Sequence, residues 1–527
     1  MLLVGIALRS WQWLENYPLW IDELALANGL LRGSFAGLFD GPSDFAQIAP
    51  PGFLALEWLV SRAFPASDIA LRLPSFVFSC AAIAATWSAA RELVGERNAW
   101  VAAGLVALAG PLIFMGSQTK PYAADVFFSA LILACALRHD RIASPGTMAW
   151  LLAAGLIAPL FSFGSVFVLA GAGSYLLLRA PRRGSALWPV LLTLASWATF
   201  ALATLLLSRR LLSPRSAALM IQYWNEGFPT AEPFSLGALD WIAEKILGLL
   251  WSEMGLRGVW AFGAALVIGA VLAWRRGPAL VAMLLVPVVT AVVAATFYQY
   301  PFGHRVAHWA IPIFAILLAI VAAFIAHWSG RQARWLSVLP GLATLSTPLW
   351  ALATNPPPYA RDDVRTHMAR LSAEGQPGDL LYVYWGAWHA WQRYGTRLAT
   401  TLGRVHEGGC PVDYPRGYLR EFDRFRGQRR LWVLFVRVRS AEEHGVLTGY
   451  LDRIGTRNAS LEVAVRGVDH TARADLYLYD LSDTARHTLA DAESFPIPDA
   501  IVRREVGCPS LDAMMHRADD TRVVQFF

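Results

Sequence analysis

Long apolar runs separated by short polar clusters fill the chain up to about Asn355. Because a helix needs about 20 apolar residues to cross a bilayer, runs of this kind predict membrane-spanning helices. We expect eleven spans. They lie near residues 1–14, 69–90, 98–116, 122–137, 147–160, 164–179, 187–207, 257–274, 279–298, 306–327 and 335–353.

Arginine clusters mark every second loop between these runs. They contain Arg91 and Arg97, Arg138 and Arg141, Arg179 with Arg182 and Arg183, Arg275 and Arg276, and Arg331 with Arg334. The positive-inside rule places these loops in the cytoplasm, so the alternate loops face outward. The first run, up to Leu14, is short for a span. Either Trp11 and Trp13 anchor it at the interface or, as we favour, the natural chain starts upstream.

Two outward loops are long, at about 15–68 and 208–256. In the first, leucines recur at helical spacing from Leu24 to Leu38, and a second helical stretch begins at Pro51. The second loop has a similar stretch near Leu239–Trp251. These patterns predict amphipathic helices that lie on the membrane surface.

Beyond about Asn355 the chain has the composition of a soluble domain. Short β-rich runs, at Leu380–Tyr384, Arg430–Val436 and Asp475–Tyr479, alternate with helical stretches at Trp388–Tyr394 and Gly445–Ile454. Alternation of this kind predicts a small α/β domain. The predicted organisation is a transmembrane module over residues 1–354 and an extracytoplasmic α/β domain over residues 355–527.

Composition supports this division. The chain is 56% hydrophobic and 16% charged, whereas soluble proteins carry about 25% charged residues. The net charge of +6 is divided among loops, which argues for topology signals and membrane lipids rather than a nucleic-acid partner. Of the four cysteines, Cys410 and Cys508 lie in the tail. A disulfide between them is compatible with an oxidising compartment, and no Cys-x-x-Cys spacing indicates zinc.

The segment from Trp20 to Leu24 carries adjacent carboxylates, Asp22 and Glu23, just after the first apolar run. One interpretation is that they are solvated charges that favour the dipole of a surface helix. The other is that one carboxylate accepts a proton during a reaction, with apolar neighbours limiting water.

A second candidate is the short outward loop from Ser117 to Tyr122. Pro121 suits the first turn of the next helix, so Lys120 stands at a helix N-terminus and could bind phosphate. The alternative is a lysine that reaches lipid headgroups. Asp125, one turn into the helix, needs a partner, for which Lys120 and Arg305 are candidates.

The third candidate is the outward loop from Tyr298 to Arg305, followed by His308. The positive-inside rule disfavours an arginine here, so Arg305 indicates an anionic ligand. That ligand is either an ordinary lipid headgroup or the phosphate of a substrate. His304 could donate to phosphate, bind a metal or cap the turn.

These motifs resemble those of bacterial GT-C glycosyltransferases related to protein O-mannosyltransferases and to the lipid A aminoarabinose transferase. The resemblance rests on Trp20-Ile21-Asp22-Glu23, Gln47-Ile48-Ala49-Pro50-Pro51-Gly52-Phe53, Ala70-Leu71-Arg72-Leu73-Pro74-Ser75, Lys120-Pro121-Tyr122 with Asp125, and Tyr300-Pro301-Phe302-Gly303 with Arg305. It covers the membrane part of the chain and its order of elements. The tail resembles extracytoplasmic domains of this group loosely.

The resemblance implies an inverting transfer of a sugar from a polyprenyl-phosphate donor to a glycan, lipid or protein acceptor at the bacterial inner membrane. It assigns the catalytic carboxylate to Asp22, with Glu23 beside it. Expected ligands of the donor phosphate are Lys120, Tyr122, His304 and Arg305, and expected substrate-binding residues are Gln47, Arg72, Gln118 and Asp125.

Two departures matter. Gln118 stands where relatives often have Glu, and His304 stands where they often have Gly. The missing carboxylate leaves a divalent metal without a clear ligand set, so metal dependence stays open.

Two other functions remain. A transporter or flippase for a lipid-linked sugar predicts internal repeats and charges at mid-membrane, and neither is clear here. A non-catalytic assembly or receptor subunit would use the tail as its binding module. The sequence leaves the sugar and the acceptor open.

Overall fold

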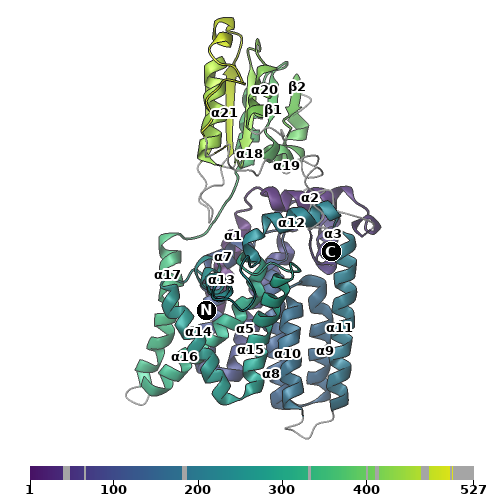
Figure 1. Cartoon of the computed structure of the whole chain (residues 1–527), viewed down its shortest axis with the longest axis vertical. Helices are drawn as coiled ribbons and strands as arrows, with labels where there is room; N and C mark the ends of the chain where they lie inside the picture. The colour runs from purple at the N-terminus through teal and green to yellow at the C-terminus, as the bar shows by residue number, and fades with distance from the viewer. Residues whose placement is uncertain are drawn as a thin grey trace. The chain divides into compact units, whose positions relative to one another are not determined.

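The computed structural model describes residues 1–39, 48–64, 67–180, 187–329, 334–398, 402–409, 415–438, 440–463, 474–498 and 501. The chain divides into two compact units (Figure 1). The first unit contains Met1–Asn16 and Gly33–Pro358, and the second contains Tyr17–Arg32 and Tyr359–Phe527. A segment of the first long loop therefore belongs with the C-terminal domain, whereas the sequence analysis assigned it to the transmembrane module.

The first unit is a bundle of helices in which α8, α9, α10 and α11 lie side by side (Figure 1). Its α-helices are α1 (Leu2–Leu14), α3 (Pro51–Ala63), α4 (Asp68–Leu71), α5 (Leu73–Val94), α6 (Glu96–Leu108), α7 (Gly110–Met115), α8 (Tyr122–Ile142), α9 (Pro145–Phe161), α10 (Ser165–Arg179), α11 (Leu187–Arg210), α12 (Pro214–Tyr223), α13 (Leu236–Gly248), α14 (Val259–Arg276), α15 (Pro278–Thr296), α16 (Ile311–Ser329) and α17 (Leu339–Thr354). Short 3-10 or π turns are η1 (Ala36–Leu38), η3 (Asn225–Gly227), η4 (Leu249–Glu253), η5 (His304–Ala310) and η6 (Arg334–Val338).

Seven helices in the described part of the chain are long and apolar enough to cross a membrane. They span Leu73–Val94, Tyr122–Ile142, Leu187–Arg210, Val259–Arg276, Pro278–Thr296, His304–Trp328 and Leu336–Thr354. The apolar helices α9 and α10 are shorter. Helical structure lies at every predicted span, but the number of eleven crossings stays a prediction.

One predicted span is broken. The run over 98–116 forms two helices, α6 and α7, because Pro111 stands in the first turn of α7. Proline has no N–H to continue the preceding helix, and its ring excludes the carbonyl one turn earlier. A single helix over this run was therefore a wrong expectation.

The basic loops gather at one end of the bundle. Three contacts join them, namely Arg141 Nε to Glu92 Oε2 at 2.7 Å, Arg179 Nη2 to Asp140 Oδ2 at 2.8 Å, and Arg276 Nη1 to the carbonyl of Leu93 at 2.7 Å. The loops after α5, α8, α10 and α14 thus share one end, as the alternation of arginines requires. Which side of the membrane they face stays a prediction.

The second unit contains a five-stranded sheet of order β2-β1-β3-β5-β4. Its strands are β1 (Leu380–Val383), β2 (Arg404–Glu407), β3 (Leu431–Val436), β4 (Thr456–Val463) and β5 (Ala474–Asp480). Strands β1, β2 and β3 are parallel, and β5 runs antiparallel to both β3 and β4. All six residues of β3 are buried, so both faces of this strand are covered.

Helices complete the second unit. They are α2 (Ile21–Arg32), α18 (Val364–Glu374), α19 (Trp388–Ala390), α20 (Arg416–Asp423) and α21 (Ala441–Ile454), with turns η7 (Trp385–Ala387), η8 (Trp391–Gly395), η9 (Thr396–Leu398) and η10 (Thr484–Thr488). Residues of α20 and α21 form one hydrophobic core with the sheet. The predicted α/β character of the tail is confirmed, and β1, β3 and β5 match the three predicted strands.

Two expectations fall outside the described residues. Cys410 and Cys508, the candidate disulfide pair, lie in segments that the structure does not describe, and so does Gln47.

Candidate functional site

The loop before α8 is fixed to the corner between α4 and α5. The hydroxyl of Ser75 donates to the carbonyl of Lys120 (2.7 Å), and the hydroxyl of Thr119 donates to the carbonyl of Leu71 (3.3 Å). Arg72 lies in this corner, immediately before α5. Lys120 and Arg72 are both buried. Two candidate cations are thus placed on adjoining backbone segments, with Lys120 two residues before the start of α8.

Arg305 reaches the same helix start. Its Cζ lies 5.7 Å from the ring centroid of Tyr122 and 5.1 Å from that of Trp224. Its Nη2 donates to the hydroxyl of Tyr223 at 3.2 Å. Because Tyr122 is the first residue of α8, the loops that carry Lys120 and Arg305 meet at this tyrosine.

The two histidines of the third motif differ. His304 is exposed, has a positive φ of 47°, and lies 3.7 Å from Glu226 by Nε2 and Oε2. His308 is fully buried, with its Nε2 2.6 Å from Oε2 of Glu253 and its ring 5.9 Å from that of Tyr122. Burial opposes charge on Glu253, but the hydrogen bond and the charge of His308 hold the pKa of Glu253 below its ordinary value.

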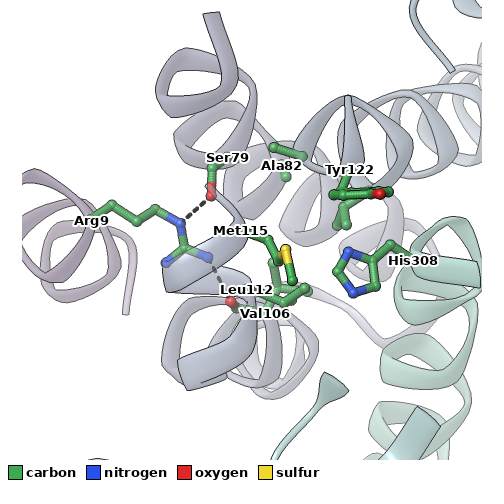
Figure 2. A pocket seen from close by; sticks show the side chains of 10 residues that line it. Arg9, Ser79, Ala82, Val106, Leu112, Met115, Tyr122 and His308 are labelled. Carbon is green, nitrogen blue, oxygen red and sulfur yellow. Dashed lines mark hydrogen bonds between the residues drawn. The ribbon is translucent and has the colours of Figure 1, made fainter. Parts of the chain in front are cut away.

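A small cavity lies beside Tyr122 and His308 (Figure 2). Arg9, Met115, Tyr122 and His308 line it, and its volume of about 10 Å³ has room for about one water molecule. The guanidinium of Arg9 donates to Ser79 Oγ at 2.7 Å and to backbone carbonyls of α6. The cavity is too small for a sugar, so it belongs to the packing that fixes Tyr122 and His308.

The prediction that Lys120 or Arg305 is the partner of Asp125 was wrong. Oδ1 of Asp125 accepts a hydrogen bond from Ser162 Oγ at 2.6 Å, and the backbone N–H of Gly164 also donates to this carboxyl. Asp125 therefore faces the connection between α9 and α10. Its contacts within the described ranges are made there rather than with Lys120 or Arg305.

Gln118 marks a polar position inside this corner. Its side chain is 1% exposed, and neither its amide nitrogen nor its amide oxygen has a hydrogen-bond partner among the residues that the structure describes. A buried amide of this kind costs free energy unless water or a ligand satisfies it.

The two carboxylates of the first motif lie in the second unit. Glu23 is fully buried, and its Oε2 accepts a hydrogen bond from the backbone N–H of Trp20 at 3.3 Å. This is the backward contact of a capping box, which stabilises a helix start. Asp22 is half-buried in the first turn of α2. The structure therefore gives Glu23 a structural role at the start of α2.

Metal ligands do not gather in the part of the chain described. No group of three or more His, Cys, Asp or Glu side chains there could hold a metal ion.

Several residues around Tyr122 were not predicted from the sequence. Tyr223 ends α12 and Trp224 follows it; this helix was not predicted, so nothing drew attention to them. Glu253 lies two residues beyond the predicted surface stretch Leu239–Trp251, and an acidic residue near a span was an available signal. Arg9, a cation inside an apolar run, was another.

No family model and no curated protein matches the chain. Among solved structures, ArnT from Cupriavidus metallidurans bound to undecaprenyl phosphate is 13% identical, with a TM-score of 0.47 over 90% of this chain and 97% of that chain. Apo ArnT gives 13% identity and a TM-score of 0.45 over 91% and 98% of the two chains. The Archaeoglobus fulgidus oligosaccharyltransferase complex with Zn and sulfate gives 13% and 0.45 over 82% of this chain and 67% of that chain.

These likenesses concern the fold.

Proposed function

We propose that this protein is a GT-C type membrane glycosyltransferase that takes a sugar, a hexose or a pentose, from a polyprenyl-phosphate donor. The observation that carries the proposal is the meeting of the Lys120 loop and Arg305 at Tyr122, beside the N-terminus of α8. A helix N-terminus, a lysine and an arginine are the groups that bind phosphate in proteins.

The aromatic side chains support this assignment. Tyr122 and Trp224 contact the guanidinium of Arg305 through their rings, and Tyr223 accepts its hydrogen bond. A guanidinium held in this way is oriented before the ligand arrives, so less entropy is lost on binding. Charge that develops on the departing phosphate would be stabilised by groups already in place.

The proposed reaction is a displacement at the anomeric carbon. A hydroxyl oxygen of the acceptor forms a bond to this carbon as the bond from the carbon to the phosphate oxygen breaks, with inversion. The hydroxyl proton passes to a carboxylate, for which Asp22 stays the proposed base. Polyprenyl phosphate leaves with its charge neutralised by Lys120 and Arg305. We place the reaction on the outer face of the bacterial inner membrane, with residues 359–527 extracytoplasmic.

Donor binding tests the proposal. In purified full-length protein, Lys120→Ala and Arg305→Ala should each weaken binding of a polyprenyl-phosphate sugar by about 1.5–3 kcal/mol, the range for a charge-assisted hydrogen bond. Arg257→Ala is the matched control, because Arg257 is an exposed arginine in the loop before α14. Its affinity for the donor should equal that of the unmodified protein.

The same preparations separate the alternatives. Release of polyprenyl phosphate together with a glycosylated acceptor supports the transferase. Movement of intact donor between the leaflets of a vesicle, without release, would support a transporter. Donor affinity that is equal in all three variants would remove the phosphate site from this corner.

A further inference from the structure

Residues 17–32 lie at a particular edge of the C-terminal sheet. The carboxyl ends of β1 and β3 meet there, because the two strands are parallel neighbours. The chain passes from β1 to β2 on one side and then back past β1 to β3 on the other. In open α/β sheets, the edge beside such a reversal is the usual place for a ligand.

Segments that leave this edge hold the chain just before α2 and again inside the helix. After β1, the hydroxyl of Tyr394 accepts a hydrogen bond from the backbone N–H of Leu19 at 2.8 Å. The carbonyl of His389 accepts one from Nδ2 of Asn28 at 3.3 Å. The helix thus occupies the position where a separate domain of this topology would bind a small molecule.

Trp20 attaches the start of α2 to two arginines of the domain. Its ring centroid lies 4.1 Å from Cζ of Arg361 and 4.8 Å from Cζ of Arg437, and the side chain is 2% exposed. Arg361 precedes α18, and Arg437 directly follows β3. We call these three residues the Trp20 clamp. Guanidinium groups over a buried indole are attracted by the ring electrons more strongly than in water.

Arg437 is held in an unusual conformation for this contact. Its φ is +54°, a left-handed value that arginine rarely adopts. Its Nε donates to Oδ2 of buried Asp362 at 2.8 Å. A strained backbone maintained by a buried ion pair is typical of residues whose placement serves a function.

We propose that the C-terminal α/β domain positions the catalytic carboxylate: the Trp20 clamp fixes the first turn of α2, and with it Asp22, for the transfer step. Trp20, Arg361 and Arg437 are positioning residues, and this inference rests on Asp22 being the base of the proposed function. Glu23 connects the clamp to that turn, because its carboxylate accepts the N–H of Trp20. The ligand of this edge of the sheet is therefore the protein's own helix.

Turnover in the full-length protein gives the first test. Trp20→Leu removes the aromatic face, so kcat should fall roughly 10- to 100-fold, as for a displaced catalytic group, while the KM for the donor stays unchanged. Trp20→Phe keeps a face and should recover most of kcat. Arg361→Gln should lower kcat in the same way. Arg453→Gln, at an exposed arginine of α21, is the control and should leave kcat and KM unchanged.

Hydrogen exchange in the same variants gives a result that does not depend on activity. In Trp20→Leu, amides of α2 should lose protection while those of β1 and β3 keep it. Unchanged protection of the α2 amides would overturn the clamp. Loss of amide protection across the whole sheet would overturn it as well, because it would show that Trp20 stabilises the core of the domain. Loss in α2 with full kcat would overturn the positioning role. A protein without transferase activity but with the expected exchange pattern would contradict the proposed function, and with it the catalytic role of Asp22, while the attachment of α2 by the Trp20 clamp would stand.

Discussion

Asp22 and Glu23 are neighbours in sequence, yet the structure gives them different surroundings. Glu23 is fully buried and caps the N–H of Trp20, whereas Asp22 is half-buried in the first turn of α2. A buried capping carboxylate is satisfied by the helix that it stabilises. Glu23 therefore serves the start of α2, and the half-buried Asp22 stays the proposed proton acceptor.

This difference predicts the behaviour of two isosteric variants. Asp22→Asn removes the proton acceptor but keeps the shape, so turnover should fall by about 10²–10⁴-fold with donor binding largely kept. Glu23→Gln keeps an amide oxygen that can accept the N–H of Trp20, so activity should change little. The measurement is a transfer assay alongside donor binding. The opposite pattern would show that Glu23 is the base, and full turnover in both would remove the base from α2.

Asp379 makes stability of the second unit depend on pH. Burial opposes its charge, but hydrogen bonds from Arg430 (2.7 Å), from the N–H of Gln376 and from Trp432 Nε1 (2.7 Å) hold the pKa of Asp379 below its ordinary value. Because the pKa is lower in the folded state, the stabilisation is complete above the unfolded pKa of about 3.9. This stabilisation is lost as the pH falls through the pKa that Asp379 has in the folded state.

Proteolysis of the full-length protein at increasing urea concentrations measures the unfolding midpoint of the second unit. We expect this midpoint to fall as the pH is lowered below about 4. At pH 7, Asp379→Asn should lower the free energy of unfolding by about 1.5–3 kcal/mol, and the urea midpoint should fall with it. The midpoint of the variant should also change less as the pH is lowered. An equal acid dependence in the variant and the unmodified protein would assign it to other carboxylates.

At the scale of elements, periodicity predicted most helices because each apolar run is long enough to be unambiguous. It failed where local chemistry overrode the pattern, as at Pro111 between α6 and α7. It also missed β2, since Arg404–Glu407 is short and largely polar. A strand of this kind is defined by its neighbours in the sheet, which a single sequence does not display. It missed β4 as well, although Ala459, Leu461 and Val463 alternate with polar residues and were an available signal.

Close packing between α9 and α11 gives a prediction at this scale. A Cβ added at Gly155 would lie 2.1 Å from Nε1 of Trp197, a buried ring that donates to the carbonyl of Leu152. Gly155→Ala should therefore destabilise the bundle by about 1–3 kcal/mol, the cost of overpacking. Gly146→Ala in the same helix is the control, because its nearest neighbour is Ser144 Oγ at 3.9 Å.

Thermal unfolding in detergent compares the two variants. The melting temperature should fall for Gly155→Ala and stay constant or rise slightly for Gly146→Ala. Equal melting temperatures of the two variants would contradict this prediction, because they would mean that α9 and α11 can move apart without a loss of stability.

At the scale of the whole molecule, the sequence predicted which loops belong together but not how they meet. Alternating arginines predicted that Lys120 and Arg305 lie in loops on one side, while the contact of Arg305 with Tyr122, two residues after Lys120, depends on the packing of α8 against η5. The sequence likewise did not predict that residues 17–32 belong to the same unit as the C-terminal tail. Contacts between segments so distant in the chain leave no periodic signal.

The predicted topology can be tested with single cysteines in a background that lacks the four native ones. Arg275→Cys, in the basic end of the bundle, should be protected from a membrane-impermeant maleimide in intact cells. Glu232→Cys and Arg453→Cys, both at exposed positions, should be labelled. Labelling of position 275 with protection of position 453 would invert the chain and place the proposed donor site in the cytoplasm.

A cryo-EM structure of the full-length protein with a bound polyprenyl phosphate would test the proposed donor site most directly. We expect phosphate oxygens to lie about 2.7–2.9 Å from Nζ of Lys120 and from the guanidinium of Arg305, the distances of charge-assisted hydrogen bonds. The lipid should follow a groove between helices of the first unit. A phosphate bound elsewhere on the chain, with both side chains out of reach, would contradict it.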